Sequence, residues 1–159
     1  MRESFDVLVR LLEYEVWCSF RALEAVEALP ADDCRRDFGF GWRTPHATMF
    51  HIADVMRGWG RTVGPAIEQP AWRPYDSSLP LQDIRTMLTD AATHLVAAVK
   101  ASHEAGVLGE QRRLHQVFHV VTHGTHHRGQ LLSMLTLMGR PQPFEGGDFG
   151  GWSKTRRVR

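Results

Sequence analysis

Apolar residues recur at steps of three and four along most of this chain, which is the spacing of one face of an α-helix. Between Ser4 and Leu29 the positions that follow this spacing are Phe5, Leu8, Val9, Leu12, Val16, Phe20, Leu23 and Val26. Pro30 stops the pattern, because a proline inside a helix removes a backbone hydrogen bond and clashes with the preceding turn. The pattern therefore predicts a first helix over residues 4–29.

Three further segments carry the same spacing. A second helix is predicted over residues 44–63, because Thr44 is a favourable N-cap and Pro45 suits the first helical turn. A third is predicted over residues 81–103, and a fourth over residues 111–138, where a Gly-Arg-Pro sequence ends the pattern.

Four helices with one apolar stripe each can share a core only as a bundle, so we expect an all-α fold, a four-helix bundle. It is expected to form a single domain over residues 1–159, with an irregular C-terminal tail from about residue 140. The short connection between the third and fourth helices predicts that they are antiparallel neighbours, and the long, proline-rich connection over residues 65–80 permits a crossover. The aromatic residues of the two irregular segments that we expect to fold back onto the bundle are Trp72, Tyr75, Phe144, Phe149 and Trp152.

Composition and charge narrow the class of protein. Apolar residues make up 43% and charged residues 23% of the 159 residues, as in ordinary globular proteins. The formal net charge is only +1, so no large electrostatic field favours nucleic acid or a membrane surface as a partner. No apolar stretch reaches the roughly 18 residues that span a bilayer, and no secretory signal pattern is present. Two isolated cysteines, Cys18 and Cys34, fit a reducing compartment, so we expect a soluble, cytoplasmic protein.

Histidines are concentrated in the fourth predicted helix. Five of the nine histidines of the chain lie in residues 115–127. At about 100° per residue, His123 and His127 fall in the middle of the apolar stripe of this helix. The apolar residues of that stripe are Val120, Leu131, Met134 and Met138. The histidines on its flank are His115, His119 and His126.

Two histidines one helical turn apart can bind the same metal ion. On a core face, two such rings must otherwise both find hydrogen-bond partners, or cost about 1–3 kcal/mol each. His123 and His127 are therefore either a metal-binding pair or a pair of hydrogen-bonded core histidines. His119 with His123 is an alternative pair at the same spacing, although it lies off the centre of the stripe.

His51, in the second predicted helix, is the best candidate for a third ligand. Small residues in its own row, such as Gly58, leave space for an ion and a bound molecule. The strongest apolar stripe of this helix is centred about 110° from His51, so the periodicity places His51 at the border of the stripe. His46, at the helix start, is expected to be solvated or to cap the helix. His94 and His103 are expected on the solvent side of the third helix.

Polar residues close to these histidines are candidates for further roles. Asp54 lies one turn from His51 and could orient an imidazole or act as a catalytic base, although a solvated carboxylate is the simpler interpretation. Gln130 lies near the face of His127 and could donate a hydrogen bond to a ligand or substrate. Arg128 is expected to serve an interface.

The sequence His-Gly-Thr-His-His-Arg-Gly-Gln over residues 123–130 follows a histidine midway along the second helix and precedes an apolar run to Gly139. This combination resembles the DinB family, damage-inducible metal-binding bundles related to the bacillithiol- and mycothiol-dependent transferases. Trp17 and the Thr44-Pro45 opening of the second helix also match the family. The resemblance covers nearly the whole chain.

The resemblance implies a four-helix bundle in which three histidines bind one divalent ion, commonly nickel or zinc. Carried over residue by residue, it implies that His51, His123 and His127 are the ligands and that His126 is not. It also implies a homodimer.

Three neutral imidazoles leave a divalent ion with open positions for a thiol or a water molecule. The leading hypothesis, implied by the resemblance, is a metal-dependent enzyme that transfers a low-molecular-weight thiol to an electrophile. A metal-activated water would instead make the protein a hydrolase. A non-catalytic metal- or ligand-binding bundle of the stress response fits the residues equally well, and the sequence identifies neither the substrate nor the native metal.

Overall fold

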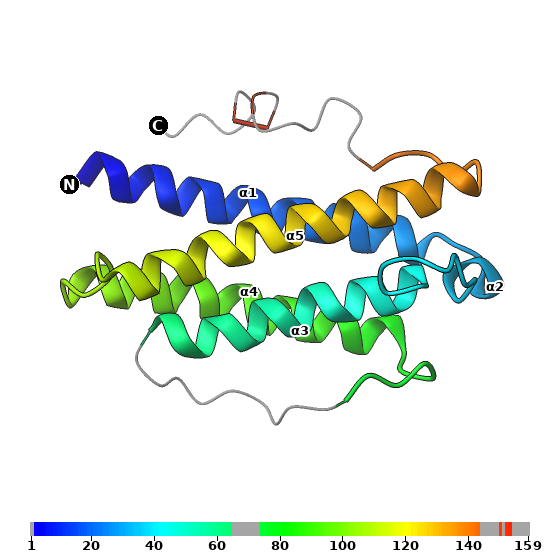
Figure 1. Cartoon of the computed structure of the whole chain (residues 1–159), viewed down its shortest axis with the longest axis horizontal. Coiled ribbons are helices and arrows are strands. Elements are labelled where there is room, and N and C mark those ends of the chain that lie inside the picture. The colour runs from blue at the N-terminus through cyan, green and yellow to red at the C-terminus, as the bar shows by residue number, and fades with distance from the viewer. Residues whose placement is uncertain (1, 65–73, 144–149, 151, 154–159) are drawn as a thin grey trace.

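Residues 2–64, 74–143, 150, 152 and 153 are described in the computed structural model of the chain, with side chains from residue 5 onward (Figure 1). The helices are α1 (Arg2–Glu27), α2 (Ala31–Cys34), α3 (Pro45–Val63), α4 (Leu81–Glu104) and α5 (Gln111–Leu137). No strand occurs in the described ranges, which confirms the expected all-α class.

The four long helices begin and end close to the predicted positions. The predicted N-cap of α3 is confirmed: the Thr44 hydroxyl accepts a hydrogen bond from the backbone N–H of Ala47 at 3.0 Å. The short helix α2 lies between the first two predicted helices, where the apolar periodicity predicted no helix. Its first turn carries Asp32 and Asp33, whose charges complement the positive end of a helix, and its last residue, Cys34, is buried.

The long helices are arranged so that consecutive helices are not always neighbours. In Figure 1, α1 and α5 run in one direction, and α3 and α4 run in the other. Helix α3 packs against α4 and α5, and α1 packs against the same two helices. Within the described residues, α4 and α5 have no comparable contact and lie diagonally across the bundle. The prediction that these two helices are neighbours is therefore wrong. The crossover between α3 and α4 is confirmed, because these two helices are parallel and the connection must run from the end of one to the opposite end of the bundle.

The end of α3 is bonded to both of the diagonally placed helices. The carbonyl oxygen of Val63 accepts hydrogen bonds from Ser102 Oγ of α4 at 2.7 Å and from Arg113 Nη1 of α5 at 2.6 Å. These bonds hold the end of α3 between the end of α4 and the start of α5. Close packing at the same place involves Gly64, where a Cβ atom would lie 2.5 Å from Ala98 Cβ.

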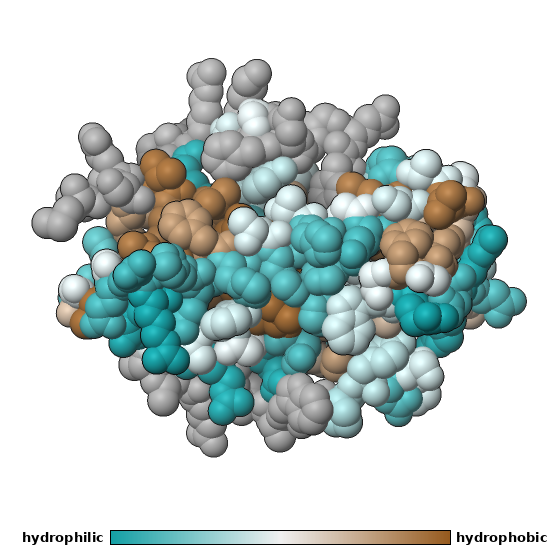
Figure 2. Space-filling model, in the orientation of Figure 1, coloured by the Kyte–Doolittle hydropathy of each residue, from teal (hydrophilic) through white to brown (hydrophobic). Residues whose placement is uncertain are grey.

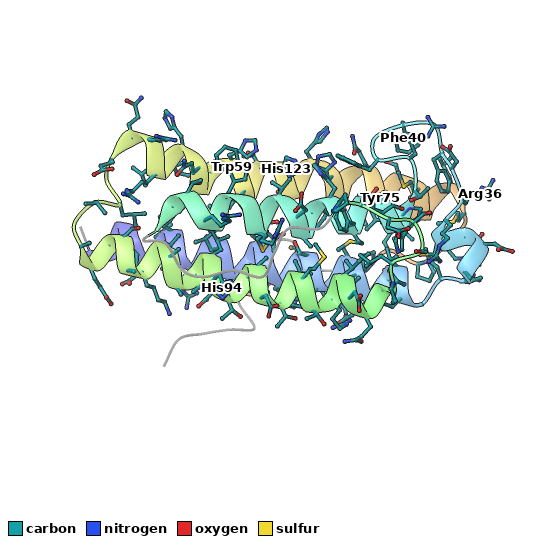
Figure 3. All side chains as sticks on the ribbon, turned by 90° about the horizontal axis from the view of Figure 1, so that it is seen from below. Arg36, Phe40, Trp59, Tyr75, His94 and His123 are labelled. Carbon is teal, nitrogen blue, oxygen red and sulfur yellow. The ribbon has the colours of Figure 1, made fainter. Side chains whose placement is uncertain are left out.

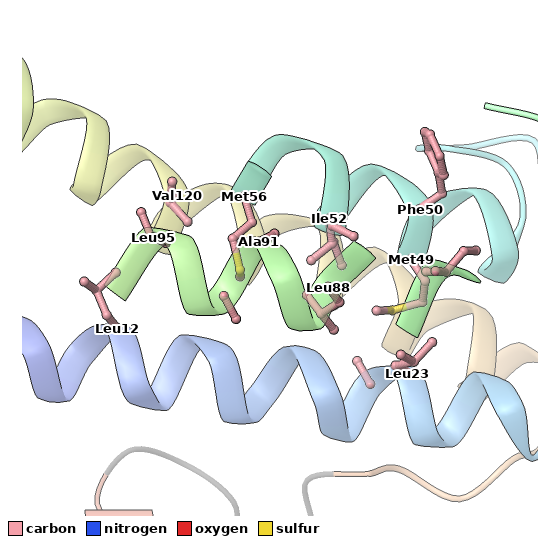
Figure 4. Close-up of a cluster of buried hydrophobic side chains, with 14 of the residues drawn as sticks. Leu12, Leu23, Met49, Phe50, Ile52, Met56, Leu88, Ala91, Leu95 and Val120 are labelled. Atoms are coloured by element: carbon pink, nitrogen blue, oxygen red, sulfur yellow. The ribbon is translucent and has the colours of Figure 1, made fainter. Parts of the chain in front are cut away.

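All four long helices contribute to one core (Figure 4). The central residues are Leu12 and Leu23 of α1, Met49, Ile52 and Met56 of α3, Leu88, Ala91 and Leu95 of α4, and Val120 of α5. Each fully buried leucine, isoleucine or methionine contributes about 1.5–3 kcal/mol. These apolar faces fix the rotation of each helix about its axis, and hence the direction in which its polar residues point.

Two of the aromatic residues expected to fold back onto the bundle do so. The ring of Tyr75 lies 5.2 Å from that of Phe50, and Trp152 is buried with its ring 5.5 Å from that of Tyr14. The other three, Trp72, Phe144 and Phe149, lie outside the described residues. Both cysteines are free and buried. None of the helices in the described ranges has the length and apolar character needed to span a membrane.

Candidate metal centre

Three histidines from two helices converge between α3 and α5. His51 of α3 and His123 and His127 of α5 each offer one ring nitrogen, and the three nitrogens lie within 4.8 Å of one another. The Nε2 atoms of His51 and His123 are 2.9 Å apart. The ring of His127 is centred 4.3 Å from that of His123 and 4.5 Å from that of His51. The structure thus brings together the three residues that the sequence singled out as a metal-binding group.

The apolar faces of α3 and α5 place these rings. Ile52 and Met56 point into the core, so the neighbouring position of His51 lies at the edge of the apolar face, beside α5. On α5, His127 is buried and His123 is half-buried. Figure 3 shows His123 on the same edge of the bundle as Trp59 of α3, and His94 of α4 on the opposite edge. The group is therefore partly covered by protein and partly open to a small molecule.

The three rings are neutral at ordinary pH. Burial, reinforced by the charge of His127, lowers the pKa of His51 to about 4. Burial and the other histidines lower the pKa of His123 to about 3. Burial also lowers the pKa of His127. A neutral imidazole has a free lone pair, which is the form that binds a metal, and imidazole nitrogens suit zinc and nickel. The donor set therefore fits one divalent cation of this kind.

A side-chain amide orients His127. Gln130 Oε1 lies 2.9 Å from His127 Nδ1, and Gln130 Nε2 lies 3.0 Å from His126 Nε2. Because an amide oxygen only accepts hydrogen bonds, His127 carries its proton on Nδ1, which leaves the lone pair of Nε2 for a cation. Such partners of ligating histidines fix both the tautomer and the ring orientation. Gln130 is thus a positioning residue, and a direct role in catalysis stays a prediction.

The loop before α3 covers one side of the group. The indole of Trp42 stacks on the ring of His51, with centroids 4.0 Å apart and planes 25° apart. Gly41 has a φ of +56°, and a Cβ atom there would lie 2.4 Å from Gln130 Oε1. Helical periodicity did not identify this loop as part of the site. Its signal was the sequence Gly-Phe-Gly-Trp over residues 39–42, in which two glycines allow a tight turn before an aromatic residue.

The other candidate catalytic residue, Asp54, is engaged elsewhere. Its Oδ1 atom accepts a hydrogen bond from Arg57 Nη2 at 2.9 Å, and both side chains are at least partly buried. The charge of Asp54 opposes part of the lowering of the pKa of His51. No hydrogen bond joins Asp54 to a histidine in the part of the chain that is described, so its role as a base stays a prediction.

Arg128 does not serve an exposed interface as expected. It is buried and forms a two-pronged ion pair with Glu15 of α1: Nη2 lies 2.7 Å from Oε2, and Nη1 bonds Oε1. Gly124 makes room for this pair, because a Cβ atom there would lie 1.9 Å from Glu15 Oε1. The pair ties α5 to α1 directly beside the histidine group.

The remaining histidines have separate environments. The expectation that His46 is solvated or caps α3 is wrong: it is fully buried, with Nε2 2.8 Å from the carbonyl oxygen of Leu79 and Nδ1 3.0 Å from the Tyr75 hydroxyl. The segment that leads into α4 folds over the start of α3 and covers it. His119 is exposed, and its ring lies 4.8 Å from that of Trp59. The ring of His123 lies between those of His119 and His127, so His119 is outside the group.

Comparison with known proteins gives the same assignment as the histidine pattern. The family model of the DinB family matches residues 1–153. A search of curated proteins found no match. Since the matched region covers almost all of the 159 residues and includes every residue of the histidine group, the chain belongs to the DinB family.

Proposed function

We propose that the protein binds one divalent metal ion, nickel or zinc, through His51, His123 and His127, and that it uses this ion to transfer a low-molecular-weight thiol to an electrophile. The observation that carries the proposal is the convergence of three neutral imidazoles on a partly open site. Three histidines are a common ligand set of catalytic metal sites, in which a further position remains for substrate or water.

A bound divalent ion favours the thiolate form of a thiol, which is the nucleophilic form. In the proposed reaction a new bond forms between the thiol sulfur and an electrophilic carbon, and the leaving group departs with the electron pair of the broken bond. The thiol proton is released to solvent. The residues of the chain prepare this site: Gln130 holds His127 in one tautomer, and Trp42 covers the ring of His51.

Metal content is the first test. His123→Ala and His127→Ala are expected to abolish stoichiometric metal in protein purified without chelator, measured by elemental analysis. His126→Ala is expected to retain it, because His126 is exposed and is not one of the three histidines whose ring nitrogens converge. His94→Ala, on the opposite edge of the bundle, is a matched control for the loss of one histidine. Full metal content in both His123→Ala and His127→Ala would exclude this ligand set.

Turnover is the second test. Purified protein is offered a small thiol and an electrophile, with metal and after chelation, and product is measured by mass spectrometry. A faster reaction with metal supports the transferase, and equal rates with and without metal refute it. The homodimer implied by the family is a further part of the proposal, and sedimentation analysis tests it.

A non-catalytic metal-binding bundle is the second candidate function. It is favoured by one observation: within the described residues, Asp54, the carboxylate nearest in sequence to His51, is paired with Arg57 and bonds no histidine. Stoichiometric metal without turnover of any thiol and electrophile pair would support this candidate. Metal-dependent hydrolysis of an electrophile, without added thiol, would instead support the hydrolase.

A further inference from the structure

A cleft of about 570 Å³ opens beside the histidine group, between the second half of α3 and the first half of α5. The residues that line it are Trp59, Gln111, Arg112, His115, Gln116 and His119. In Figure 2, hydrophilic side chains form a band across the face of the molecule that α5 and α3 present to the viewer. No residue of this cleft belongs to the proposed ligand set.

The cleft and the histidine group are continuous. The ring of His119 lies 4.8 Å from that of Trp59 and 5.4 Å from that of His123. His119 is therefore the point at which the wall of the cleft meets the proposed ligands. His123 follows Gln116 by seven positions of helix, which corresponds to about 10 Å along the axis of α5. A molecule of the size of a small peptide can thus occupy the cleft and still reach the histidines.

Gln116 provides an unused hydrogen-bond acceptor in the wall of the cleft. Its side chain is 6% exposed, and its Oε1 atom is buried without a hydrogen-bond partner in the described part of the chain. Buried polar atoms are nearly always paired in folded proteins, by protein or by water. An N–H or O–H group of a bound molecule would satisfy this oxygen.

Arg112 provides a positive charge at the same cleft. It is exposed, lies in the first turn of α5, and forms no ion pair with any described residue. The neighbouring Arg113, in contrast, bonds Glu110 and the carbonyl oxygen of Val63 and is part of the framework. The N-terminal end of a helix also carries a partial positive charge. An anionic group is therefore favoured at this end of the cleft.

We propose that this cleft binds the non-reacting end of the substrate thiol, and that this end carries a carboxylate and a hydrogen-bond donor. The carboxylate pairs with Arg112, the donor bonds Gln116 Oε1, and the sulfur reaches the histidine group past His119. The identification of the ligand as a thiol rests on the proposed function; the binding of a carboxylate with a nearby donor rests on the cleft itself.

Glutathione is a suitable probe, because it combines a thiol, amide N–H groups and carboxylates. Its diethyl ester is a matched probe without the carboxylate charges. Binding of both is measured by titration calorimetry to the protein as purified and to His123→Ala. Arg112→Met and Gln116→Leu each remove one proposed contact, and Lys100→Met removes one exposed cation on α4, away from the cleft.

We expect glutathione to bind about two- to fivefold more tightly than its ester, since an ion pair with an exposed side chain such as Arg112 contributes a factor of about five at most. Arg112→Met is expected to remove this preference, Gln116→Leu to weaken binding of both probes, and Lys100→Met to change neither. Gln116→Leu should also raise the midpoint of thermal unfolding, because it removes a buried oxygen that lacks a partner. If Gln116 served only to stabilise the fold, the same substitution would lower that midpoint.

Equal affinity for the two probes, wild-type affinity in Arg112→Met and Gln116→Leu, or no binding of glutathione at millimolar concentrations would overturn the inference. The two proposals fail separately. In His123→Ala the dependence on Arg112 and Gln116 should persist, although metal and turnover are lost. If Arg112→Met and Gln116→Leu do not change the rate of thiol transfer, the proposed function is supported but the cleft does not bind the substrate.

Discussion

Glu15→Leu removes one half of the buried ion pair that joins α1 to α5. The side chains of Arg128 and Glu15 are only 6% and 1% exposed, so the guanidinium that remains cannot be hydrated in its place. Among the described residues it keeps the hydroxyls of Ser19, 3.2 Å from Nη1, and Thr125, 3.3 Å from Nη2. Leaving such a charge uncompensated costs about 3–5 kcal/mol.

The same argument applies to Arg128→Met, which leaves the carboxylate of Glu15 buried with the Ser19 hydroxyl, at 3.3 Å, as its remaining hydrogen-bond donor in the described ranges. At about 2–4 °C per kcal/mol for a chain of this size, each single variant should lower the melting temperature by roughly 6–20 °C. The double variant replaces the pair by apolar side chains of similar volume, which is often close to neutral, so we expect it to lose only about 1–2 kcal/mol. The coupling energy between the two sites should then be at least about 4 kcal/mol.

Urea unfolding followed by far-ultraviolet circular dichroism measures all four proteins of this cycle. Glu24→Leu is a matched control, because Glu24 forms an ion pair with Arg21 in which both side chains are about half exposed. Exposed pairs of this kind contribute about 1 kcal/mol or less. Costs of Glu15→Leu and Arg128→Met that simply add in the double variant, or single costs no larger than that of Glu24→Leu, would refute the reasoning.

Gly41→Ala should weaken metal binding about 10–100-fold in competition with a chelator, because the new Cβ atom would displace Gln130 from His127. Gly39→Ala is the control: Gly39 also has a positive φ, +74°, but open space surrounds it, so this variant shares the backbone strain and should bind metal normally. Zinc at about 100 times its dissociation constant should stabilise the wild-type protein by about 2.7 kcal/mol and leave His123→Ala unshifted in a thermal melt. Burial lowers the pKa of His46 from its ordinary value of 6.5, so the unfolded chain binds this proton more readily and stability falls as the pH drops below 6.5. His46→Gln should show a smaller fall in denaturant titrations across that range, and an unchanged slope would contradict this role of His46.

The sequence alone predicted the four long helices and supplied the candidate histidines, of which the family resemblance selected three. The apolar periodicity predicted the four long helices nearly to their ends, because each helix buries one stripe and begins or ends at a proline, a glycine or a cap. The same periodicity placed His123 and His127 on the core face of α5 and His51 at the border of the stripe on α3. The structure brings these three rings together and leaves His119 outside the group.

Only the tertiary structure decided what depends on contacts between distant segments. The diagonal placement of α4 and α5 follows from the packing of α1 and α3 between them, and the length of the connecting loop does not encode it. Helical periodicity describes one helix at a time, so it did not show that Arg128 pairs with Glu15, that His46 is covered by Tyr75, or that Gly41 lies against Gln130. The candidate metal ligands could be predicted from the sequence. The residues that hold them in place could not, because their contacts form only between helices that are packed together.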